Sequence, residues 1–485
     1  MIDHSIENIY NAFMFMQEVY KKRRQAFLEA IRDRGITRGT VLLLANSHCP
    51  RNYPDNCYPF RQDSSWLYLI GLNIPDLACT LDIESEESCL YAEELGLEEI
   101  IWTGELPSPV EQAYSVGIEK VLPTSYLSNN VKQTLKLREP VFILPPYQDR
   151  KIAQLSEIFG TARSSLEELI YRYIDPRVIM ALVSVREIKE PEELAEIERA
   201  VSITKNIHEE LLHQLKAGWT EKDAAGFVLS RASAQGCELS FATIATCRSS
   251  VLHNSPTEHI ATAHDTFLLD AGVETPLGYA GDLTTTFPVG PSFSHQSKEI
   301  YQVLCESFKT ATNALAPGVR FLDVHKKASL TITKGLISLG LMKGDPVEAV
   351  ESGAHALFFP HGLGHQIGLD VHDMEGLGED YVGYGEELKR SEQFGLRSLR
   401  LAKTLKPGMV HSVEPGIYFI PQLVQKWRTE RICENFLNYD IIEKWMPVGG
   451  MRIEEDWCII DKGARRLGPA FDKSIEAIEN VRANR

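Results

Sequence analysis

Five residues of metal-binding type, each in a short and distinctive segment, are the residues of this sequence best suited to chemistry. They are Asp270, Asp282, His365, Glu414 and Glu454, in the segments FLLDAG, AGDLTTTF, PHGLGHQIGLDVHD, SVEPGIY and GGMRIEED. Four carboxylates and one imidazole form an oxygen-rich ligand set, which suits two adjacent hard or borderline cations better than one thiolate-bound zinc. The set therefore predicts a dimetal site and, with it, a hydrolase.

Asp270 and Asp282 form the first pair of this set. Asp270 ends the apolar run TFLLD, and Asp282 begins DLTTTFPV after the turn TPLGYAG. Either residue alone is as readily explained as a strand-end or turn aspartate. On two antiparallel strands joined by that turn, however, the two side chains can face each other, and a mutually repelling pair needs a cation between them.

Three histidines, His361, His365 and His372, fall within one Gly-rich segment. His361 and His365 have the spacing by which a helix offers two zinc ligands, but the two glycines between them disfavour a helix and no Glu follows His361. We therefore reject a helical zinc motif. We expect the glycines to let the backbone run close to a substrate, with one histidine on the metal and the others facing the reacting carbonyl.

Glu414 and Glu454 each lie in a strand-like run. A single Glu is more often a solvated surface group, so the coincidence of the whole set carries the prediction. Alternation along MRIEEDW puts Arg452 and Glu454 on one face of the strand and Glu455 on the other. This pattern predicts Glu454 as the ligand and Arg452 as its orienting partner.

The elements that must position these residues belong to an α+β chain that, at 485 residues, is long for a single core, so we expect two domains or one large domain with a lobe. We expect a smaller α/β domain over residues 1–178 and the catalytic domain over residues 179–485. Apolar periodicity predicts helices over 19–34, 186–215 and 220–235. Short apolar runs predict strands from Val41, Trp66, Ala78, Glu99 and Val141, and over 241–246 and 266–271.

Composition limits the classes of partner. The net charge of −17 disfavours nucleic acid, and the absence of an apolar run of 18 residues predicts no membrane span. The apolar patch over residues 9–20 contains Asn11 and Glu18, so we expect an ordinary first helix there rather than a signal peptide. Nine cysteines without a CxxC pair predict reduced thiols and a cytoplasmic protein.

The C-terminal segments closely resemble the metallopeptidases of the pita-bread fold, namely aminopeptidase P, prolidase and, more distantly, methionine aminopeptidase. The resemblance extends over residues 184–479 and implies a pita-bread catalytic domain. It implies that the two-metal centre has the ligands Asp270, Asp282, His365, Glu414 and Glu454, and that Glu414 also shuttles a proton. It further implies that substrate or the tetrahedral intermediate is contacted by His253 in VLHN, His361 and His372.

Two other segments resemble different members of this group. NCYPFRQDSSWLYLIGLNIPD, with IWTGE after it, resembles the N-terminal domain of aminopeptidase P and favours an Xaa-Pro aminopeptidase. GLRSLRLAKTLKPGM resembles prolidase, in which an arginine matching Arg400 is implied to hold the carboxylate of a dipeptide, so an Xaa-Pro dipeptidase is the alternative. Cys247 and Arg248 stand where the relatives carry small residues, and we expect this difference to affect substrate preference.

The same resemblance implies the cofactors and partners. We expect two divalent ions, manganese first with cobalt or zinc as alternatives, and peptide substrates with proline in the second position. Relatives are commonly dimers or tetramers, so we expect a homo-oligomer. A binding module of this fold that has lost its ligands, and a metal-free hydrolase of creatinase type, are both disfavoured because all five ligand positions are intact.

Overall fold

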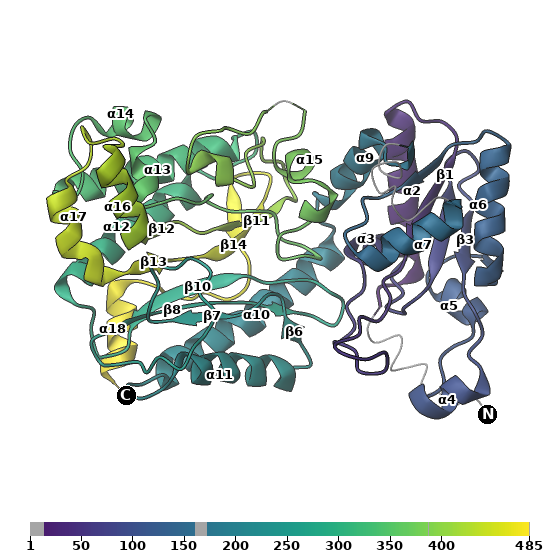
Figure 1. Cartoon of the computed structure of the whole chain (residues 1–485), viewed down its shortest axis with the longest axis horizontal. Helices are drawn as coiled ribbons and strands as arrows, with labels where there is room; N and C mark the ends of the chain where they lie inside the picture. The colour runs from purple at the N-terminus through teal and green to yellow at the C-terminus, as the bar shows by residue number, and fades with distance from the viewer. Residues whose placement is uncertain (1–13, 161–171, 387, 485) are drawn as a thin grey trace. The chain divides into compact units, whose positions relative to one another are not determined.

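The computed structural model describes residues 14–160, 172–386 and 388–484. The chain divides into two compact units (Figure 1): unit 1 comprises residues 1–186 and 374–381, and unit 2 comprises residues 187–373 and 382–485. Residues 9–13 of the expected first helix lie outside the described residues. Within those that are described, no helix is both long and apolar enough to cross a membrane.

Unit 1 is built around one mixed sheet with the strand order β4-β3-β2-β1-β5. β1 pairs antiparallel with β2 and parallel with β5, while β3 pairs antiparallel with β2 and parallel with β4. Its described elements are α2 (Gln17–Asp33), β1 (Thr40–Leu44), α3 (Ser64–Leu69), β2 (Ala78–Asp82), β3 (Ser88–Tyr91), α4 (Leu97–Thr103), α5 (Pro109–Ser115), β4 (Lys120–Leu122), η1 (Thr124–Tyr126), α6 (Leu127–Lys136), β5 (Val141–Ile143), α7 (Asp149–Phe159), α9 (Pro176–Arg186) and η3 (Glu375–Leu377).

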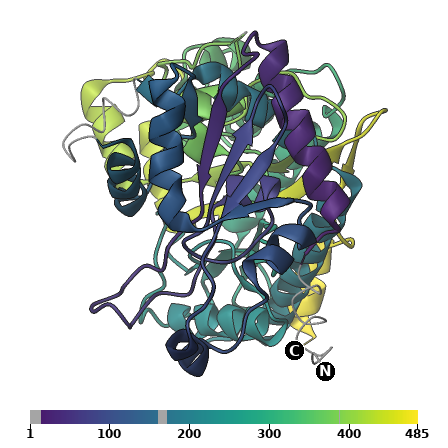
Figure 2. The same cartoon turned by 90° about the vertical axis from the view of Figure 1, so that its right-hand side faces the viewer.

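Alternation along the strands decides which face of this sheet each helix covers. Leu42 and Leu44 of β1 point to the face packed by α6 and α7, through side chains such as Val131 and Leu155. Figure 2 shows α6 on one side of the sheet and α2 on the other. Helices on both faces of a sheet confirm the α/β character expected of the N-terminal half.

Unit 2 contains the remaining elements. They are α10 (Pro191–Gln214), α11 (Glu221–Ala234), β6 (Glu238–Leu239), β7 (Ile244–Thr246), β8 (Thr266–Ala271), β9 (Val273–Glu274), β10 (Leu283–Pro288), α12 (His295–Asn313), α13 (Phe321–Ser338), α14 (Pro346–Glu351), η2 (Ala354–Leu357), η4 (Leu396–Ser398), β11 (Val410–Val413), β12 (Gly416–Tyr418), α16 (Pro421–Glu430), α17 (Tyr439–Trp445), η5 (Met446–Val448), β13 (Gly450–Arg452), β14 (Glu455–Ile459), β15 (Ala464–Arg466) and α18 (Ile475–Ala483). The short helix α15 (Glu379–Gly383) crosses from the last segment of unit 1 into unit 2.

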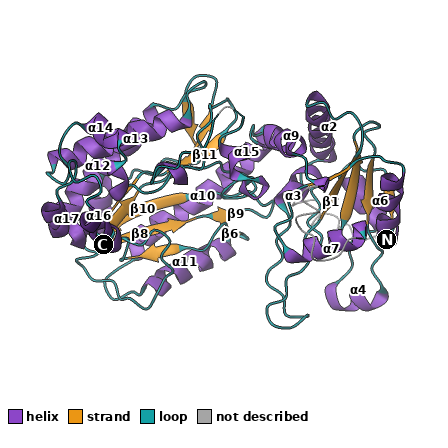
Figure 3. Ribbon diagram, turned by 45° about the horizontal axis from the view of Figure 1, so that its top comes forward, coloured by secondary structure: helices purple, strands orange, loops and turns teal. Residues whose placement is uncertain are grey.

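The strands of unit 2 form small sheets that lie between two pairs of helices (Figure 3). The main sheets have the orders β10-β8-β7 and β11-β14-β15, and β12 pairs with β13. An antiparallel bridge between Thr284 and Glu454 joins β10 to the chain between β13 and β14. Helices α10 and α11 pack on the first sheet, while α12 contacts β11, β12 and β13. The long helices therefore enclose a strand layer whose polar residues are shielded from solvent.

Most predicted elements of both units are present. The helices predicted over 19–34 and 220–235 correspond to α2 and α11, and the strand predicted over 266–271 is β8. The helix predicted over 186–215 corresponds to α10, which begins only at Pro191. Pro191 occupies its first turn, and the Glu190 N–H donates to Glu193 Oε2 at 3.0 Å.

Two predicted strands are wrong. The run from Trp66 forms α3, because Asp63 caps the helix by accepting a hydrogen bond of 2.9 Å from the Trp66 N–H. The run from Glu99 forms α4, whose first turn is closed by a bond of 3.0 Å from the Gly96 N–H to Glu99 Oε2. Short apolar runs fit a strand or a helix equally well, and the capping residues decide between them.

Candidate metal centre

The paired aspartates come from neighbouring antiparallel strands, which confirms the predicted hairpin geometry. Asp270 lies in β8 opposite Thr284 of β10, and Asp282 directly precedes β10. The backbone connecting them is packed too tightly for side chains: a Cβ on Gly272 would lie 1.9 Å from the Gly281 carbonyl oxygen. The glycines of DAG and AGD therefore hold both carboxylates at one end of the hairpin.

Glu454 lies beside the two aspartates although it comes from a segment late in the sequence. Its N–H donates to the Thr284 carbonyl at 3.2 Å, and its Oε2 accepts from Thr284 Oγ1 at 2.6 Å. Lys473 Nζ donates to the carbonyl oxygens of both residues, at 3.0 Å and 2.6 Å. These bonds fix Glu454 beside β10 although about 170 residues separate the two segments.

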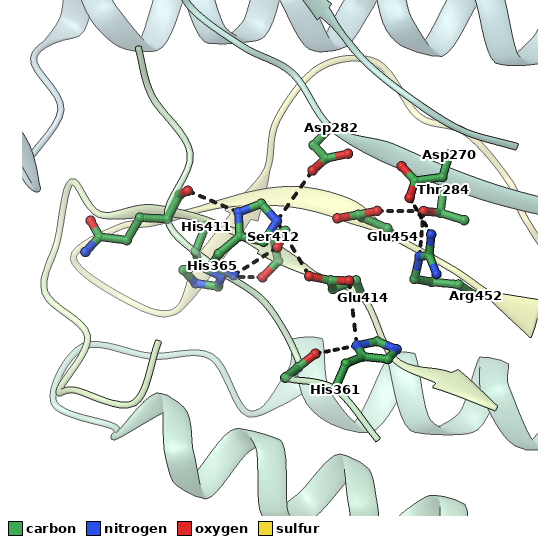
Figure 4. Close-up of polar contacts among 12 residues, drawn as sticks. Asp270, Asp282, Thr284, His361, His365, His411, Ser412, Glu414, Arg452 and Glu454 are labelled. Atoms are coloured by element: carbon green, nitrogen blue, oxygen red, sulfur yellow. Dashed lines mark hydrogen bonds and ion pairs between the residues drawn. The ribbon is translucent and has the colours of Figure 1, made fainter. Parts of the chain in front are cut away.

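His365 and Glu414 complete the cluster (Figure 4). His365 Nε2 lies 3.5 Å from both Asp282 Oδ2 and Glu414 Oε1, and its Nδ1 lies 3.2 Å from the Gln366 carbonyl oxygen. Because a carbonyl only accepts, Nδ1 carries the proton and Nε2 is left with a lone pair toward the carboxylates. An imidazole in this state is suited to bind a cation.

The glycines around His365 have a packing role that the sequence did not predict. A Cβ on Gly364 would lie 2.2 Å from the Ser412 carbonyl oxygen, and one on Gly362 would lie 2.9 Å from the Leu399 Cα. Their small size is thus required for close packing against the protein's own backbone. The expectation that they admit a substrate is not needed to explain them.

The electrostatics of the cluster favour bound cations. Ligand atoms of Asp282, His365 and Glu454 all lie within 4.8 Å of one another, and all three residues are buried. Burial raises the pKa of Asp282 and of Glu454 well above the ordinary values, and the charges of neighbouring carboxylates raise them further. Burial, followed by the charge of Glu454, raises the pKa of Glu414 to about 8.

Hydrogen bonding leaves part of this cluster unsatisfied. Asp270 Oδ1 and Asp282 Oδ1 are buried and have no hydrogen-bond partner among the described residues. Buried carboxylate oxygens without donors are costly unless a cation meets them. The donor set, its burial and these two oxygens fit a pair of divalent metal ions.

Arg452 provides the buried positive charge within the cluster. Its guanidinium pairs with Asp270 Oδ2, while Nε donates to Thr284 Oγ1 at 3.1 Å and NH1 to the Tyr418 hydroxyl at 2.6 Å. Arg452 therefore orients Asp270 directly, and it acts on its predicted partner Glu454 through the shared Thr284 hydroxyl and through its charge. As predicted, Arg452 and Glu454 lie on one side, where both bond the Thr284 hydroxyl, while Glu455 pairs with Arg466, although β13 ends at Arg452 and β14 begins only at Glu455.

His361 lies at the edge of the cluster with both ring nitrogens engaged. Its Nδ1 lies 2.8 Å from the Gly362 carbonyl oxygen and 3.9 Å from Glu414 Oε2, and its Nε2 lies 3.1 Å from the Tyr418 hydroxyl. Burial, followed by the charge of Arg452, lowers the pKa of His361 to about 3. The ring is therefore neutral, with Nδ1 donating and Nε2 accepting from Tyr418.

Three other residues were predicted to contact substrate: His372, His253 and Arg400. The ring of His372 is half-buried and stacks obliquely on His365, with centroids 4.0 Å apart. His253 is exposed in the loop after β7, and its charge contributes to the low pKa of His361. Arg400 is half-buried after η4, and none of the five predicted ligands forms an ion pair or hydrogen bond with it in the described residues.

Sequence reasoning missed several residues that support the cluster. Thr284 bonds both Glu454 and Arg452, Tyr418 joins Arg452 to His361, and Asp456 Oδ2 accepts from the Asp282 N–H at 2.9 Å. A signal for Thr284 was present, because it lies two positions after Asp282 on a strand and so shares its face. The contacts of Asp456 and Tyr418 are made across more than 30 positions of sequence and leave no local pattern.

Comparisons with known proteins agree with this geometry. Residues 195–461 match metallopeptidase family M24, and residues 20–142 match the aminopeptidase P N-terminal domain. A probable Xaa-Pro aminopeptidase of Coccidioides posadasii is 31% identical, covering 93% of this chain and 91% of its own length. One from Botryotinia fuckeliana is 30% identical and covers 88% of each chain. The prolidase alternative is not favoured by these relatives.

Solved structures give the same result. Escherichia coli aminopeptidase P in complex with substrate is 28% identical, with a TM-score of 0.78 over 97% of this chain and 99% of its own. A zinc-substituted form of that enzyme in complex with product is 27% identical, with the same TM-score and coverage. The predicted α+β fold with a pita-bread catalytic domain is confirmed. This chain therefore belongs to metallopeptidase family M24 and carries an aminopeptidase P N-terminal domain.

Proposed function

We propose that this protein is a metal-dependent Xaa-Pro aminopeptidase, which releases the residue that precedes proline at the start of a peptide. The observation that carries the proposal is the convergence of Asp282, His365 and Glu454 within 4.8 Å, beside the carboxylates of Asp270 and Glu414, in a metallopeptidase of family M24. The relatives that match nearly the whole chain bear the name of this activity.

The proposed ligands of the two ions are Asp270, Asp282, His365, Glu414 and Glu454. Asp282 and Glu454 are the least exposed carboxylates of the cluster, and we propose that both would hold the ions. Arg452 orients Asp270, and Thr284 orients Glu454, each through a buried hydrogen bond. Fixed ligand orientation lowers the cost of assembling such a site when the ions bind.

The substrate bond explains why such a site is useful. A peptide bond before proline is a tertiary amide without an N–H, so recognition of the scissile N–H is impossible. Bound divalent ions supply Lewis acidity toward the carbonyl oxygen and toward water. Glu414 is placed at the solvent-facing edge of the cluster, and its carboxylate is proposed to take a proton from the attacking water and pass it to the leaving proline nitrogen.

The histidines around the cluster are the proposed substrate contacts. His372 and His253 are assigned to the peptide and to the tetrahedral intermediate. His361 is assigned the same role through Nδ1, the nitrogen that carries its proton and lies 3.9 Å from Glu414 Oε2. Its neutral state is maintained by burial and by Arg452, so it would stabilise an oxyanion as a hydrogen-bond donor rather than as a cation, with Nδ1–H exchanging the Gly362 carbonyl for the oxyanion.

The native metal, the cellular compartment, the substrates and the oligomeric state are also part of the proposal. We propose manganese as the native metal, with cobalt or zinc as substitutes, because carboxylate oxygens discriminate weakly among them. All nine cysteines are free thiols, which supports a reducing, cytoplasmic environment. Substrates are proposed to be peptides with proline in second position, and the protein is proposed to act as a homo-oligomer, as its family resemblance implies.

A substrate series with ligand variants tests the proposal. With manganese, the protein should cleave Xaa-Pro-Yaa peptides and leave Xaa-Ala-Yaa peptides intact. Asp282→Asn and Glu454→Gln should abolish cleavage and lower bound metal measured by mass spectrometry. Glu455→Gln is the matched control: this adjacent carboxylate pairs with Arg466 at 3.4 Å and lies 3.9 Å from Lys473 Nζ instead of entering the cluster, and the amide can still accept from both. Full activity and metal content in Asp282→Asn would contradict the dimetal assignment.

Arg400→Ala in the same assay tests the proposed carboxylate clamp. An Xaa-Pro dipeptide places its free carboxylate where a longer peptide continues, so a clamp at Arg400 should select the dipeptide. We expect the tripeptide to be the better substrate of the unmodified protein. Selective loss of dipeptide cleavage in Arg400→Ala would support the clamp, and unchanged cleavage of both substrates would remove Arg400 from the site.

A further inference from the structure

A second group of metal-ligand side chains lies in the loop between β7 and β8 of unit 2. The Cys247 thiol, a ring nitrogen of His259 and a carboxylate oxygen of Asp265 all lie within 4.8 Å of one another. Cys247 directly follows β7, Asp265 directly precedes β8, and His259 lies in the loop between them. None of the three contacts the dimetal cluster in the described residues, so this group needs an explanation of its own.

The backbone that presents these ligands is fixed by a buried carboxylate. Glu221 Oε1 accepts from the Cys247 N–H at 3.0 Å, and Oε2 accepts from the N–H of Thr257 at 3.0 Å. The Glu221 N–H donates to the His259 carbonyl oxygen at 3.1 Å. Glu221 thus holds the chain at Cys247 and Thr257 through a side chain without solvent exposure, and at His259 through its backbone N–H.

Asp265 is held separately. Its Oδ2 accepts from the Thr262 N–H at 2.7 Å, and its carbonyl oxygen accepts from the Val289 N–H at 2.9 Å. A backbone bond of 3.1 Å from the Asp265 N–H to the Thr262 carbonyl closes the turn. The three ligands therefore approach one point from segments whose positions are set by other bonds, which reduces the entropy lost when a ligand binds.

The ligand atoms themselves are available. Among the described residues, the Cys247 thiol and the His259 ring make no side-chain hydrogen bond, and Asp265 uses only Oδ2. Burial and the charge of Asp265 raise the pKa of the Cys247 thiol to about 12. A cation that displaced the thiol proton would compensate the charges of both the thiolate and Asp265.

We propose that Cys247, His259 and Asp265 bind a divalent ion of the zinc class, separate from the dimetal cluster. Sulfur, nitrogen and oxygen ligands together favour zinc over manganese or magnesium. Zinc bonds of about 2.3 Å to sulfur and about 2.0–2.2 Å to nitrogen and oxygen place tetrahedral ligands roughly 3.5 Å apart. This spacing is compatible with ligand atoms that lie within 4.8 Å of one another before an ion binds. Water completes the fourth position, since His259 is exposed.

The site would close the loop that carries His253. Residues 247–265 leave β7 and return to β8, and a metal joined to both ends and to the middle would restrict that loop. This consequence for catalysis rests on the proposed role of His253 in substrate binding. The ion-binding site itself does not, because it is defined by three residues outside the proposed catalytic machinery.

Thiolate ligation gives the test a signal that the dimetal site does not produce. The protein, with its dimetal site loaded with manganese, is titrated with Co²⁺ under reducing conditions. A thiolate-to-cobalt charge-transfer band in the near ultraviolet is expected to grow to about one cobalt per chain. The dimetal cluster contains no thiolate, so cobalt that entered it would leave this band unchanged.

Matched variants decide whether the band belongs to this site. Cys247→Ser should remove it, and His259→Ala, a change at an exposed side chain, should weaken cobalt binding about tenfold or more. Cys433→Ser removes another half-buried thiol of the same unit and should leave the band intact. Zinc retained after dialysis, measured by mass spectrometry, should fall by about one equivalent per chain in Cys247→Ser.

Failure of this proposal is distinguishable from failure of the proposed function. The absence of the band in the unmodified protein, or a band of equal intensity in Cys247→Ser, would overturn the site whatever the peptidase activity. Equal zinc retention in the unmodified protein, Cys247→Ser and His259→Ala would do the same. If Cys247→Ser fails to fold, the comparison of His259→Ala with Cys433→Ser decides.

Discussion

Replacing Thr284 by valine should weaken metal binding without removing a ligand. The Thr284 side chain is fully buried in β10, where its hydroxyl donates to Glu454 Oε2 at 2.6 Å and accepts from Arg452 Nε at 3.1 Å. Valine has nearly the same shape as threonine but no hydroxyl, so the main change is the loss of these two hydrogen bonds. Glu454 then keeps its carboxylate but loses the donor that orients it.

The size of the effect follows from the charge on Glu454. A hydrogen bond to an ionised group contributes about 1.5–3 kcal/mol, and each 1.4 kcal/mol corresponds to a factor of about ten. Metal affinity should therefore fall roughly 10- to 100-fold, the range found for outer partners of metal ligands. Stability should fall by about 1–3 kcal/mol as well, because Arg452 Nε is left without its acceptor.

Thr286→Val is the matched control. Its hydroxyl also makes two buried bonds, donating to the Arg452 carbonyl at 2.8 Å and accepting from the Arg452 N–H at 3.2 Å, but it contacts no proposed ligand. Calorimetric titration with Mn²⁺ and urea unfolding measure the two effects separately. We expect Thr286→Val to lose stability alone, while Thr284→Val loses both. Equal manganese affinity in Thr284→Val and the unmodified protein would refute the reasoning.

Two further perturbations concern the whole protein. Chelation of the metal should lower the unfolding temperature, and excess manganese should restore it, since binding at about 1,000 times the Kd adds about 4 kcal/mol of stability; identical thermal curves would contradict the metal assignment. Burial, followed by the charge of Lys473, lowers the pKa of His208 to about 3. Because the unfolded state binds the proton near pH 6.5, stability should fall by up to about 1.4 kcal/mol per pH unit below that value. His208→Gln should flatten urea-derived stability between pH 6 and 4, and an unchanged slope would count against a neutral buried His208.

The sequence predicted those parts of the site that are written in short segments. Asp270 and Asp282 were recognisable because the turn between them joins two adjacent strands, and the register of β8 and β10 follows from that turn. The same holds for α11, whose Thr220 and Asp223 cap each other reciprocally within four residues. Local signals of this kind need no knowledge of the rest of the chain.

The features that the sequence did not predict depend on distant segments. Alternation assigned Arg452 to Glu454. In the structure its guanidinium pairs with the buried carboxylate of Asp270, about 180 positions earlier in the sequence. Gly364 was assigned to substrate access, whereas its lack of a side chain is required by Ser412 of β11. In both cases the local pattern identified an important residue, and only the packed structure identified its partner.

Charge balance links the buried cluster to the number of ions that it can hold. Asp270, Asp282, Glu414 and Glu454 carry four negative charges when ionised, and Arg452 compensates one of them. A single divalent ion would leave a buried excess of negative charge, which burial strongly disfavours. Two divalent ions would give the cluster a net charge of about plus one. A hydroxide, or a substrate oxygen that becomes negative during hydrolysis, would neutralise that charge. The arrangement of one arginine among four carboxylates thus favours two ions and an anionic transition state.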